Sequence, residues 1–228
     1  TCSDDIINTF WAKAMRTLYV NMRDTYFDCP DRERAQWWGD ATVLSGQSYY
    51  QLSPEANALS CKAIHELAHW QREDGVICSP VPAGNWDLEL PAQMLASIRT
   101  YGFWYYYLHT GDSQTMADVY PAVKKYLELW SFDETGLTAY RDGDWSWGDW
   151  GSNIDLRLIL ASWHYLALES AANMAQISGN DADVAGYHKQ MRSIKDAYNK
   201  CWNGYAYRHP SYHGETDDRV NAMAILTG

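Results

Sequence analysis

The chain of 228 residues has few basic residues, no long apolar run and no paired cysteine motif. No stretch approaches the roughly 18 apolar residues of a membrane span, so we expect no membrane partner. Lys and Arg total 18 against 29 Asp and Glu, which gives a net charge of −11. Nucleic-acid backbones require basic patches, so a nucleic-acid partner is not expected either. Length and composition favour a single domain segment, residues 1–228, with an ample core.

Several motifs that would reveal a chemistry are also missing. The sequence has no Gly-rich phosphate loop and no nucleophile elbow, so nucleotide chemistry and Ser-His-Asp catalysis are not predicted, and no cofactor is expected. The five cysteines are irregularly spaced without a CxxC pair, and we expect most of them to be buried as small apolar side chains. The opening Thr-Cys-Ser-Asp-Asp is not a signal peptide, although a mature chain would have lost one. The compartment stays open, with a periplasmic or secreted protein favoured over a cytoplasmic one.

Phenylalanine is scarce, with 4 residues, whereas the chain carries 12 Trp and 17 Tyr. Trp and Tyr combine an apolar face with a polar handle, which suits both protein cores and sugar-binding surfaces. We expect more than half of them to fill the seams between secondary-structure elements. A few near the acidic segment described below are candidates for sugar platforms.

Apolar residues recur at helical spacing along most of the chain, which predicts an all-α fold. The predicted helices span 6–19, 53–73, 91–110, 112–130, 154–177 and 181–202, and a last one begins near 217. Pro121 should break or kink its helix. Short and long connections alternate, as in antiparallel helical hairpins. We expect three long loops, 24–40, 76–90 and 131–152, to gather at one end, where a rigid scaffold commonly carries its function.

The most informative segment runs from Asp28 to Asp40 and reads Asp-Cys-Pro-Asp-Arg-Glu-Arg-Ala-Gln-Trp-Trp-Gly-Asp. Pro30 disfavours helix at Cys29, and the four acids do not share one helical face. The segment therefore predicts the wall of a small polar site. Two carboxyls in different environments, beside arginine and aromatic surface, are the equipment of glycoside hydrolysis.

This segment resembles the catalytic-acid segment of the bacterial α-L-rhamnosidases of glycoside hydrolase family seventy-eight. Their usual run is Asp-Cys-Pro-x-Arg-(Asp)-Glu-Arg-x-x-Trp-x-Gly-Asp. Further family-like features follow in order, namely Asn21-Met22, Gln71 to Gly75, Trp86-Asp87 and Gly148-Asp149-Trp150. The chain departs from the run in two ways: the Asp between Arg and Glu is absent, and Trp38 replaces a small residue.

The resemblance implies an (α/α)6 six-hairpin toroid, which needs twelve helices. Because only about seven or eight are predicted at ordinary helix and loop lengths, we expect an incomplete part of that toroid. The resemblance also implies roles for individual residues. Glu33 matches the general acid, Asp28 and Asp40 match acids that hold sugar hydroxyls, and Arg32 would orient a carboxylate or contact the sugar. The implied substrate-binding residues are Asp28, Arg32, Trp37, Asp40, Trp86, Asp87 and Trp150.

The third-loop assignment is open, because Trp145, Trp147 and Trp150 crowd the same stretch. The implied activity is the inverting hydrolysis of terminal α-L-rhamnosides, with a carbohydrate as the partner. Inversion needs a second carboxylate about 6.5–9.5 Å from the acid. The resemblance places that base beyond the chain end, since the context of Glu215, the nearest acid to offer, does not match. We therefore expect little hydrolysis by these residues alone.

Two alternatives remain. A non-catalytic carbohydrate-binding toroid would use the same aromatic loops without chemistry. The run His65-Glu66-Leu67-Ala68-His69 fits the HExxH zinc-peptidase pattern, with Glu89 as a conceivable third ligand. A pattern with three fixed positions arises by chance often, so we expect His65 and His69 to be ordinary, partly exposed helix residues and predict no metal site.

Overall fold

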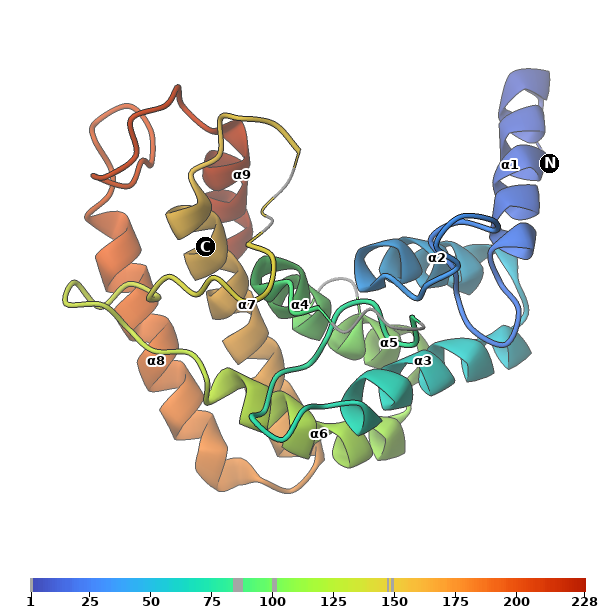
Figure 1. The fold of residues 1–228 in the computed structure, drawn as a ribbon, viewed down its shortest axis with the longest axis horizontal. Coiled ribbons are helices and arrows are strands. Elements are labelled where there is room, and N and C mark those ends of the chain that lie inside the picture. Colours follow the sequence, from blue (N-terminus) through green and yellow to red (C-terminus); the bar gives the residue numbers. More distant parts are fainter. Residues whose placement is uncertain (1, 84–87, 100–101, 147, 149) are drawn as a thin grey trace.

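The computed structural model describes residues 2–83, 88–99, 102–146, 148 and 150–228, and these residues form helices joined by loops (Figure 1). Within these ranges β-structure is limited to isolated bridges, which confirms the predicted all-α class. The α-helices are α1 (Asp5–Val20), α2 (Trp38–Gln51), α3 (Asn57–His69), α4 (Pro91–Arg99), α5 (Phe103–Thr110), α6 (Ser113–Leu127), α7 (Leu156–Ile177), α8 (Asp181–Asn199) and α9 (Asp218–Thr227). None of the described helices is long and apolar enough to cross a membrane.

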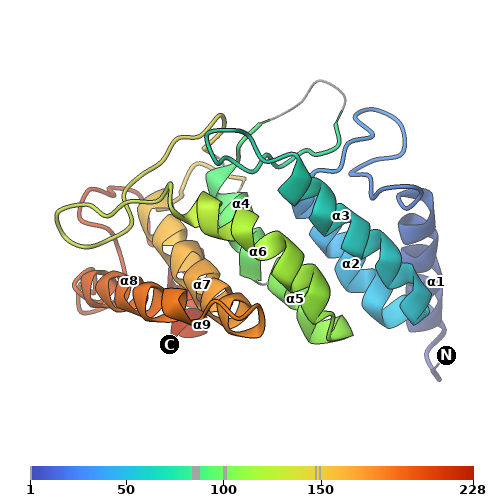
Figure 2. The same ribbon diagram turned by 90° about the horizontal axis from the view of Figure 1, so that it is seen from below.

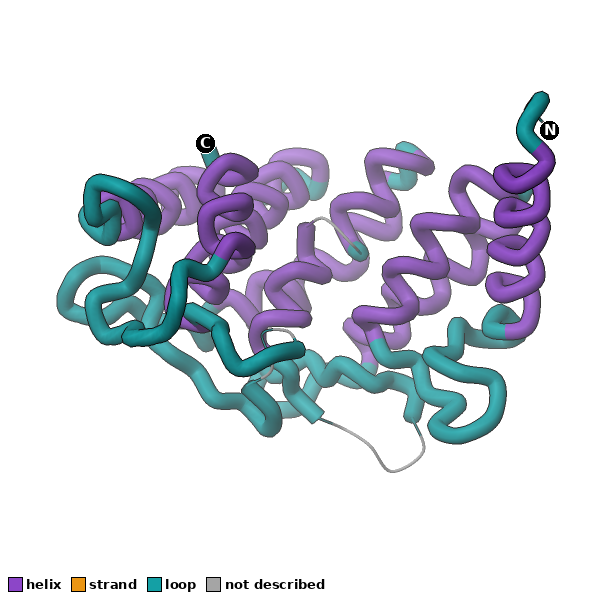
Figure 3. The backbone as a smooth tube through the Cα atoms, turned by 90° about the horizontal axis from the view of Figure 1, so that it is seen from above, coloured by secondary structure: helices purple, strands orange, loops and turns teal. Residues whose placement is uncertain are grey.

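The helices follow one another along an arc, with α1 at one end and α8 and α9 at the other (Figure 1). We call residues 21–37 the acid loop, 70–90 the middle loop and 128–155 the third loop. The described parts of all three lie on the same side of the helices (Figures 2 and 3). The predicted gathering of the long loops at one end is therefore confirmed.

The centre of the core is α7, which packs against α4, α6, α8 and α9. Leucine and alanine dominate its sequence, and residues on all its sides are buried, as expected of a helix enclosed by neighbours. Its N-terminus is capped by Asp155, whose carboxylate accepts hydrogen bonds from the main-chain N–H groups of Leu158 at 3.5 Å and His209 at 2.8 Å. A rigid central helix of this kind fixes the positions of the loops that leave its neighbours.

The predicted helix over 91–110 is in fact two helices, because the chain leaves helical geometry at Gly102. A Cβ at Gly102 would collide with the carbonyl oxygen of Ser97 and would lie 2.9 Å from Trp38 Nε1. Only glycine lets the chain pass so close to the buried Trp38. The helix predicted over 53–73 ends already at His69.

Two further sequence predictions differ from the structure. Pro121 lies inside α6 and does not end it, so the predicted break is absent. All five cysteines are free, but only Cys78 is buried, so the prediction that most of them are buried is wrong. Cys29 is partly exposed because it belongs to the acid loop, where its sulfur meets polar groups instead of core side chains.

Candidate active site

The acid loop is folded back on itself so that Asp28 and Glu33 meet. The N–H of Asp28 donates to the carbonyl of Ala35, and the N–H of Ala35 donates to Asp28 Oδ1, both at 3.0 Å. Inside this closed turn, the N–H of Glu33 donates to Cys29 Sγ at 3.2 Å. Arg34 has φ +51°, a left-handed conformation that is uncommon outside glycine. Such backbone outliers concentrate at functional sites, and this one turns the chain between Glu33 and Ala35.

The environments of the two carboxyls shift their pKa values in opposite directions. A hydrogen bond to Asp28, then partial desolvation and the charge of Asp28, raise the pKa of Glu33 against the opposing effects of Arg32 and Trp37. Desolvation acts on Asp28 too, but hydrogen bonds from Cys29, Glu33 and Ala35 outweigh it and lower the pKa of Asp28. A proton shared by the pair therefore resides on Glu33. In sites with two carboxyls, a separation of this kind favours the proton-donor role for one and the anionic role for the other.

Asp40 adds a third carboxyl at the start of α2. The residue as a whole is exposed, yet desolvation of its carboxyl and the charge of Asp28 raise its pKa. Arg32 pairs with Glu33, but its side chain is 82% exposed, so solvent screens the pair strongly. The structure thus brings together Asp28, Arg32, Glu33 and Asp40, as the sequence predicts.

A buried amide ties the acid loop to the middle loop. Gln36 is fully buried, and its Nε2 donates to the carbonyl of Val81 at 2.6 Å while its Oε1 accepts from Thr25 Oγ1 at 2.5 Å. The main-chain N–H of Trp38 donates to the carbonyl of Ser79 at 3.2 Å. Because both main-chain and side-chain hydrogen bonds join the two segments, the acid loop has a fixed position against residues 79–82. Sequence reasoning missed Gln36, since it stands at a variable position of the motif.

Two tryptophans from distant loops form an aromatic wall beside the acids. Trp37 hydrogen-bonds to Glu33 and packs edge-on against Trp145 of the third loop, with ring centroids 6.4 Å apart and planes at 79°. Of the third-loop tryptophans that the structure describes, Trp145 is the one in ring contact with Trp37, whereas Trp147 lies outside the described residues. Trp150 is 77% exposed. The predicted residues Trp86 and Asp87 lie outside the described residues.

The HExxH residues have other structural partners. His65 Nδ1 lies 2.9 Å from the carbonyl of Cys61, its Nε2 lies 3.4 Å from Asp118, and His69 is exposed. Glu66 pairs with Lys62 and accepts from Gln36 Nε2 at 3.2 Å.

The described part of the chain offers one candidate group of metal ligands. Among the described residues, three potential ligand atoms lie within 4.8 Å of one another only in the set Asp28, Cys29 and Glu33. This set does not include His65 or His69, so it gives the zinc alternative no third ligand. It also contains Glu33, whose raised pKa favours the protonated form, a poor metal ligand.

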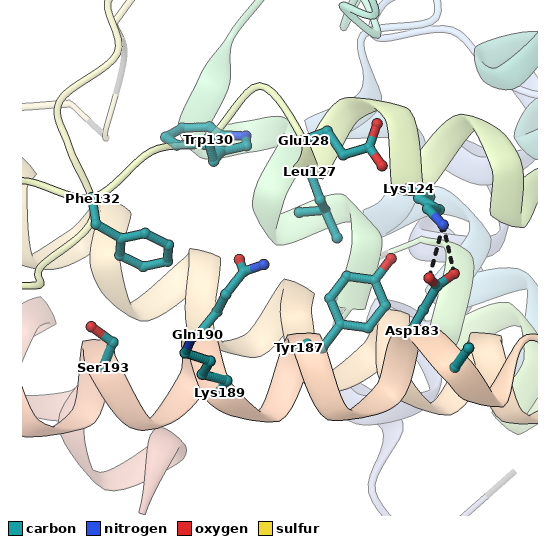
Figure 4. A pocket seen from close by; sticks show the side chains of 12 residues that line it. Lys124, Leu127, Glu128, Trp130, Phe132, Asp183, Tyr187, Lys189, Gln190 and Ser193 are labelled. Carbon is teal, nitrogen blue, oxygen red and sulfur yellow. Dashed lines mark hydrogen bonds and ion pairs between the residues drawn. The ribbon is translucent and has the colours of Figure 1, made fainter.

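A separate cleft of about 660 Å³ lies between α6 and α8 (Figure 4). Trp130, Phe132 and Tyr187 line it, and the ion pair of Lys124 with Asp183, at 2.8 Å, lies at one end. No lining residue belongs to the acid loop, so this cleft is not the site of the paired carboxyls.

Comparison with known proteins gives a consistent result. The family model of the bacterial alpha-L-rhamnosidase six-hairpin glycosidase domain matches residues 1–228. An alpha-L-rhamnosidase of Formosa agariphila is 22% identical, over 88% of this chain and 23% of its own length. One of Streptomyces avermitilis is 27% identical, over 77% of this chain and 17% of its own length. The chain thus spans about a quarter of the length of these relatives, or less.

Solved structures show the same fold. The GH78 family rhamnosidase of Bacillus sp. GL1 superposes with a TM-score of 0.82 at 22% identity, covering 100% of this chain and 25% of that one. A rhamnosidase from Klebsiella oxytoca with rhamnose bound superposes with a TM-score of 0.79 at 17% identity, covering 100% and 48%. The resemblance seen in the acidic motif therefore extends over the whole chain and its fold. The chain belongs to the family of bacterial α-L-rhamnosidase six-hairpin glycosidase domains.

Proposed function

We propose that this chain is the acid-bearing part of the catalytic domain of an inverting glycosidase that hydrolyses terminal α-L-rhamnosides, with Glu33 as general acid. The observation that carries the proposal is the opposite displacement of two pKa values in one hydrogen-bonded pair, raised at Glu33 and lowered at Asp28. A general acid must hold its proton at the working pH, which a neighbouring anion favours. The rhamnoside specificity is supported by family membership, since the matched relatives are named alpha-L-rhamnosidases.

In the proposed reaction Glu33 donates its proton to the glycosidic oxygen as the bond to the sugar breaks. Asp28, held by the N–H of Ala35, keeps that proton on Glu33 until the leaving oxygen becomes basic enough to take it. Arg32 and Trp37 stabilise the carboxylate that Glu33 becomes, because both contacts favour its ionised form. The same two contacts therefore assist the transfer and do not prevent it.

Inversion also needs a carboxylate that activates water from the opposite face of the sugar, about 6.5–9.5 Å from the acid. We assign this base to a part of the full-length protein outside these 228 residues. The relatives, which are about four times as long or longer, supply room for such a part. Asp28 and Asp40 accept hydrogen bonds from sugar hydroxyls in this scheme, as charge-assisted contacts with directional specificity. Trp37 offers the sugar an apolar face.

The experiment compares the full-length protein with its Glu33→Gln variant on two α-L-rhamnosides, one with a p-nitrophenyl and one with an alkyl leaving group. Loss of a general acid should lower kcat/KM by about 10²–10⁴ on the alkyl glycoside. The loss should be smaller on the p-nitrophenyl glycoside, because nitrophenolate leaves without protonation. Glu134→Gln, which changes an exposed acid of the third loop, is the matched control and should keep wild-type rates.

Three results would contradict the proposal. Equal losses on both substrates would exclude Glu33 as the acid. Binding of rhamnose without turnover by the wild-type protein would favour the non-catalytic carbohydrate-binding alternative. Turnover by the isolated 228 residues would exclude the assignment of the base to another part of the protein.

A further inference from the structure

An ion pair between the buried carboxylate of Glu89 and the partly exposed guanidinium of Arg141 joins the middle loop to the third loop. Glu89 is 2% exposed, and both of its carboxylate oxygens accept from Arg141, from Nε at 2.8 Å and from a terminal guanidinium nitrogen at 2.8 Å. Tyr126 of α6 donates its hydroxyl to the same carboxylate at 3.3 Å. The bidentate geometry fixes the orientation of Arg141 as well as its distance.

The main chain of Glu89 also forms hydrogen bonds with the third loop. Its carbonyl accepts from the N–H groups of Asp144 and Trp145, both at 3.1 Å, and its own N–H donates to Asp144 Oδ2 at 2.8 Å. Gly143 has φ +61°, and a Cβ there would lie 2.6 Å from Pro91 Cγ. The loop therefore turns tightly over the start of α4, directly before Trp145.

We propose that Glu89 and Arg141 are positioning residues that set Trp145 against Trp37, and that the two indoles form one wall for the apolar face of the substrate. This proposal rests on the proposed function. Each indole is carried by an anchored segment of the chain. Trp37 directly follows Gln36, which anchors the acid loop, and Trp145 belongs to the third loop, which Glu89 anchors. Their edge-on contact at 6.4 Å is the point where the two anchored segments meet.

An ion pair is a costly way to join two loops. Removing the Glu89 carboxylate from water costs free energy that its attraction to Arg141 does not reliably recover, and apolar residues of similar volume often stabilise a protein as well or better. What an apolar pair lacks is direction, because the bidentate Arg141 contact admits one orientation of the loop. The pair is therefore suited to setting geometry.

The first experiment measures KM and kcat of the full-length protein on p-nitrophenyl α-L-rhamnoside. In Glu89→Gln we expect KM to rise on the order of tenfold, the value of one aromatic contact, with kcat changed less than about twofold. A higher KM at constant kcat is the signature of lost binding with intact proton transfer. Glu169→Gln, which breaks the 3.0 Å pair of Glu169 with Arg99 away from the loops, is the matched control and should leave both constants unchanged.

A second variant, Trp145→Ala, tests the wall directly and does not depend on the ion pair folding correctly. It should raise KM as Glu89→Gln does, and the double variant should add little more, because both changes remove the same contact. Additive effects of the two changes, or an unchanged KM in Trp145→Ala, would overturn the proposal.

A spectroscopic readout separates this proposal from the proposed function. Indoles 6.4 Å apart couple in circular dichroism, so the wild-type spectrum minus that of Trp145→Phe should show a couplet. The same subtraction is then made in the double variant Glu89→Met, Arg141→Met, with and without Trp145→Phe. The methionines keep the interior packed, and we expect the couplet to be less than half its wild-type size. If the wild-type protein hydrolyses no rhamnoside, the proposed function fails while this couplet still tests the positioning. A couplet of undiminished size in the Met background would show that the ion pair does not position Trp145.

Discussion

The buried His164 should make the protein sensitive to acid, and the size of the effect follows from its surroundings. His164 lies on α7, fully buried between Trp130 and Phe132, with ring centroids at 5.4 and 5.7 Å. Its Nδ1 lies 3.0 Å from Thr138 Oγ1, and its Nε2 has no partner among the described residues. Burial lowers the pKa of His164 from 6.5 to about 3.

The sign follows from which state binds the proton. Between pH 6.5 and about pH 3 the unfolded chain protonates His164 and the folded chain does not, so acid favours unfolding. Full stability is present above pH 6.5 and is lost at about 1.4 kcal/mol per pH unit below it. At pH 5 the loss from this residue amounts to about 2 kcal/mol relative to pH 8.

The assay is urea unfolding of wild type and His164→Gln at pH 8, 6 and 5, followed by tryptophan fluorescence. Other titrating groups contribute equally to both proteins, so the difference in free energy of unfolding isolates His164. We expect His164→Gln to be less stable at pH 8 by about 1–3 kcal/mol through lost packing. At pH 5 the free energy of unfolding of His164→Gln, relative to that of wild type, should be about 2 kcal/mol higher than at pH 8, because the variant has no imidazole to protonate. His188→Gln, at an exposed position of α8, should follow the wild-type profile. A pH-independent difference for His164→Gln would refute the reasoning.

Three more predictions concern the loops and the packing beneath them. Asp28→Asn removes the anion that raises the pKa of Glu33, so the basic limb of the pH profile of kcat/KM on an aryl rhamnoside should move to lower pH; a shift to higher pH would contradict the pairing. Gly102→Ala should destabilise the protein by about 1–3 kcal/mol in thermal unfolding, because its Cβ meets Trp38 Nε1, whereas Gly46→Ala, with open space around it, should stabilise by about 0.5–1 kcal/mol; equal effects would exclude the packing argument. Gln36→Leu should cost about 1–3 kcal/mol in urea unfolding by leaving the Val81 carbonyl and Thr25 without their partner, and a neutral effect would show that the amide is dispensable.

Helical periodicity was sufficient to predict most of the helices, but α2 was missed. Its sequence contains Gly39, Gly46 and several Ser and Thr residues, all poor in helix propensity, and it begins within the acidic motif. Tertiary contacts explain why it forms: α2 packs against α4, where the side chain of Gln93 occupies the space beside Gly39. Packing of this kind leaves no periodic signal in a single sequence.

The candidate site likewise has one part that the sequence predicts and another part that it does not. Asp28 and Glu33 are close in sequence, so the motif alone predicts their meeting. The partnership of Glu89 with Arg141 spans two loops and has no local signature, and the sequence suggests Glu89 only as a zinc ligand. Its carboxylate is instead used by Arg141 and Tyr126. The choice of Trp145 over Trp150 likewise depends on a turn at Gly143 that composition cannot reveal.

The acid pair and the aromatic wall are encoded differently along the sequence. One short continuous segment closed between Asp28 and Ala35 encodes the pair, whereas the wall needs separate segments that meet only after folding. Under the proposed function, mutations in the third loop can therefore alter sugar choice during evolution while the proton-transfer chemistry is inherited intact. The same separation makes residues 128–155 the natural place to graft loops from relatives when the specificity of such an enzyme is to be redesigned.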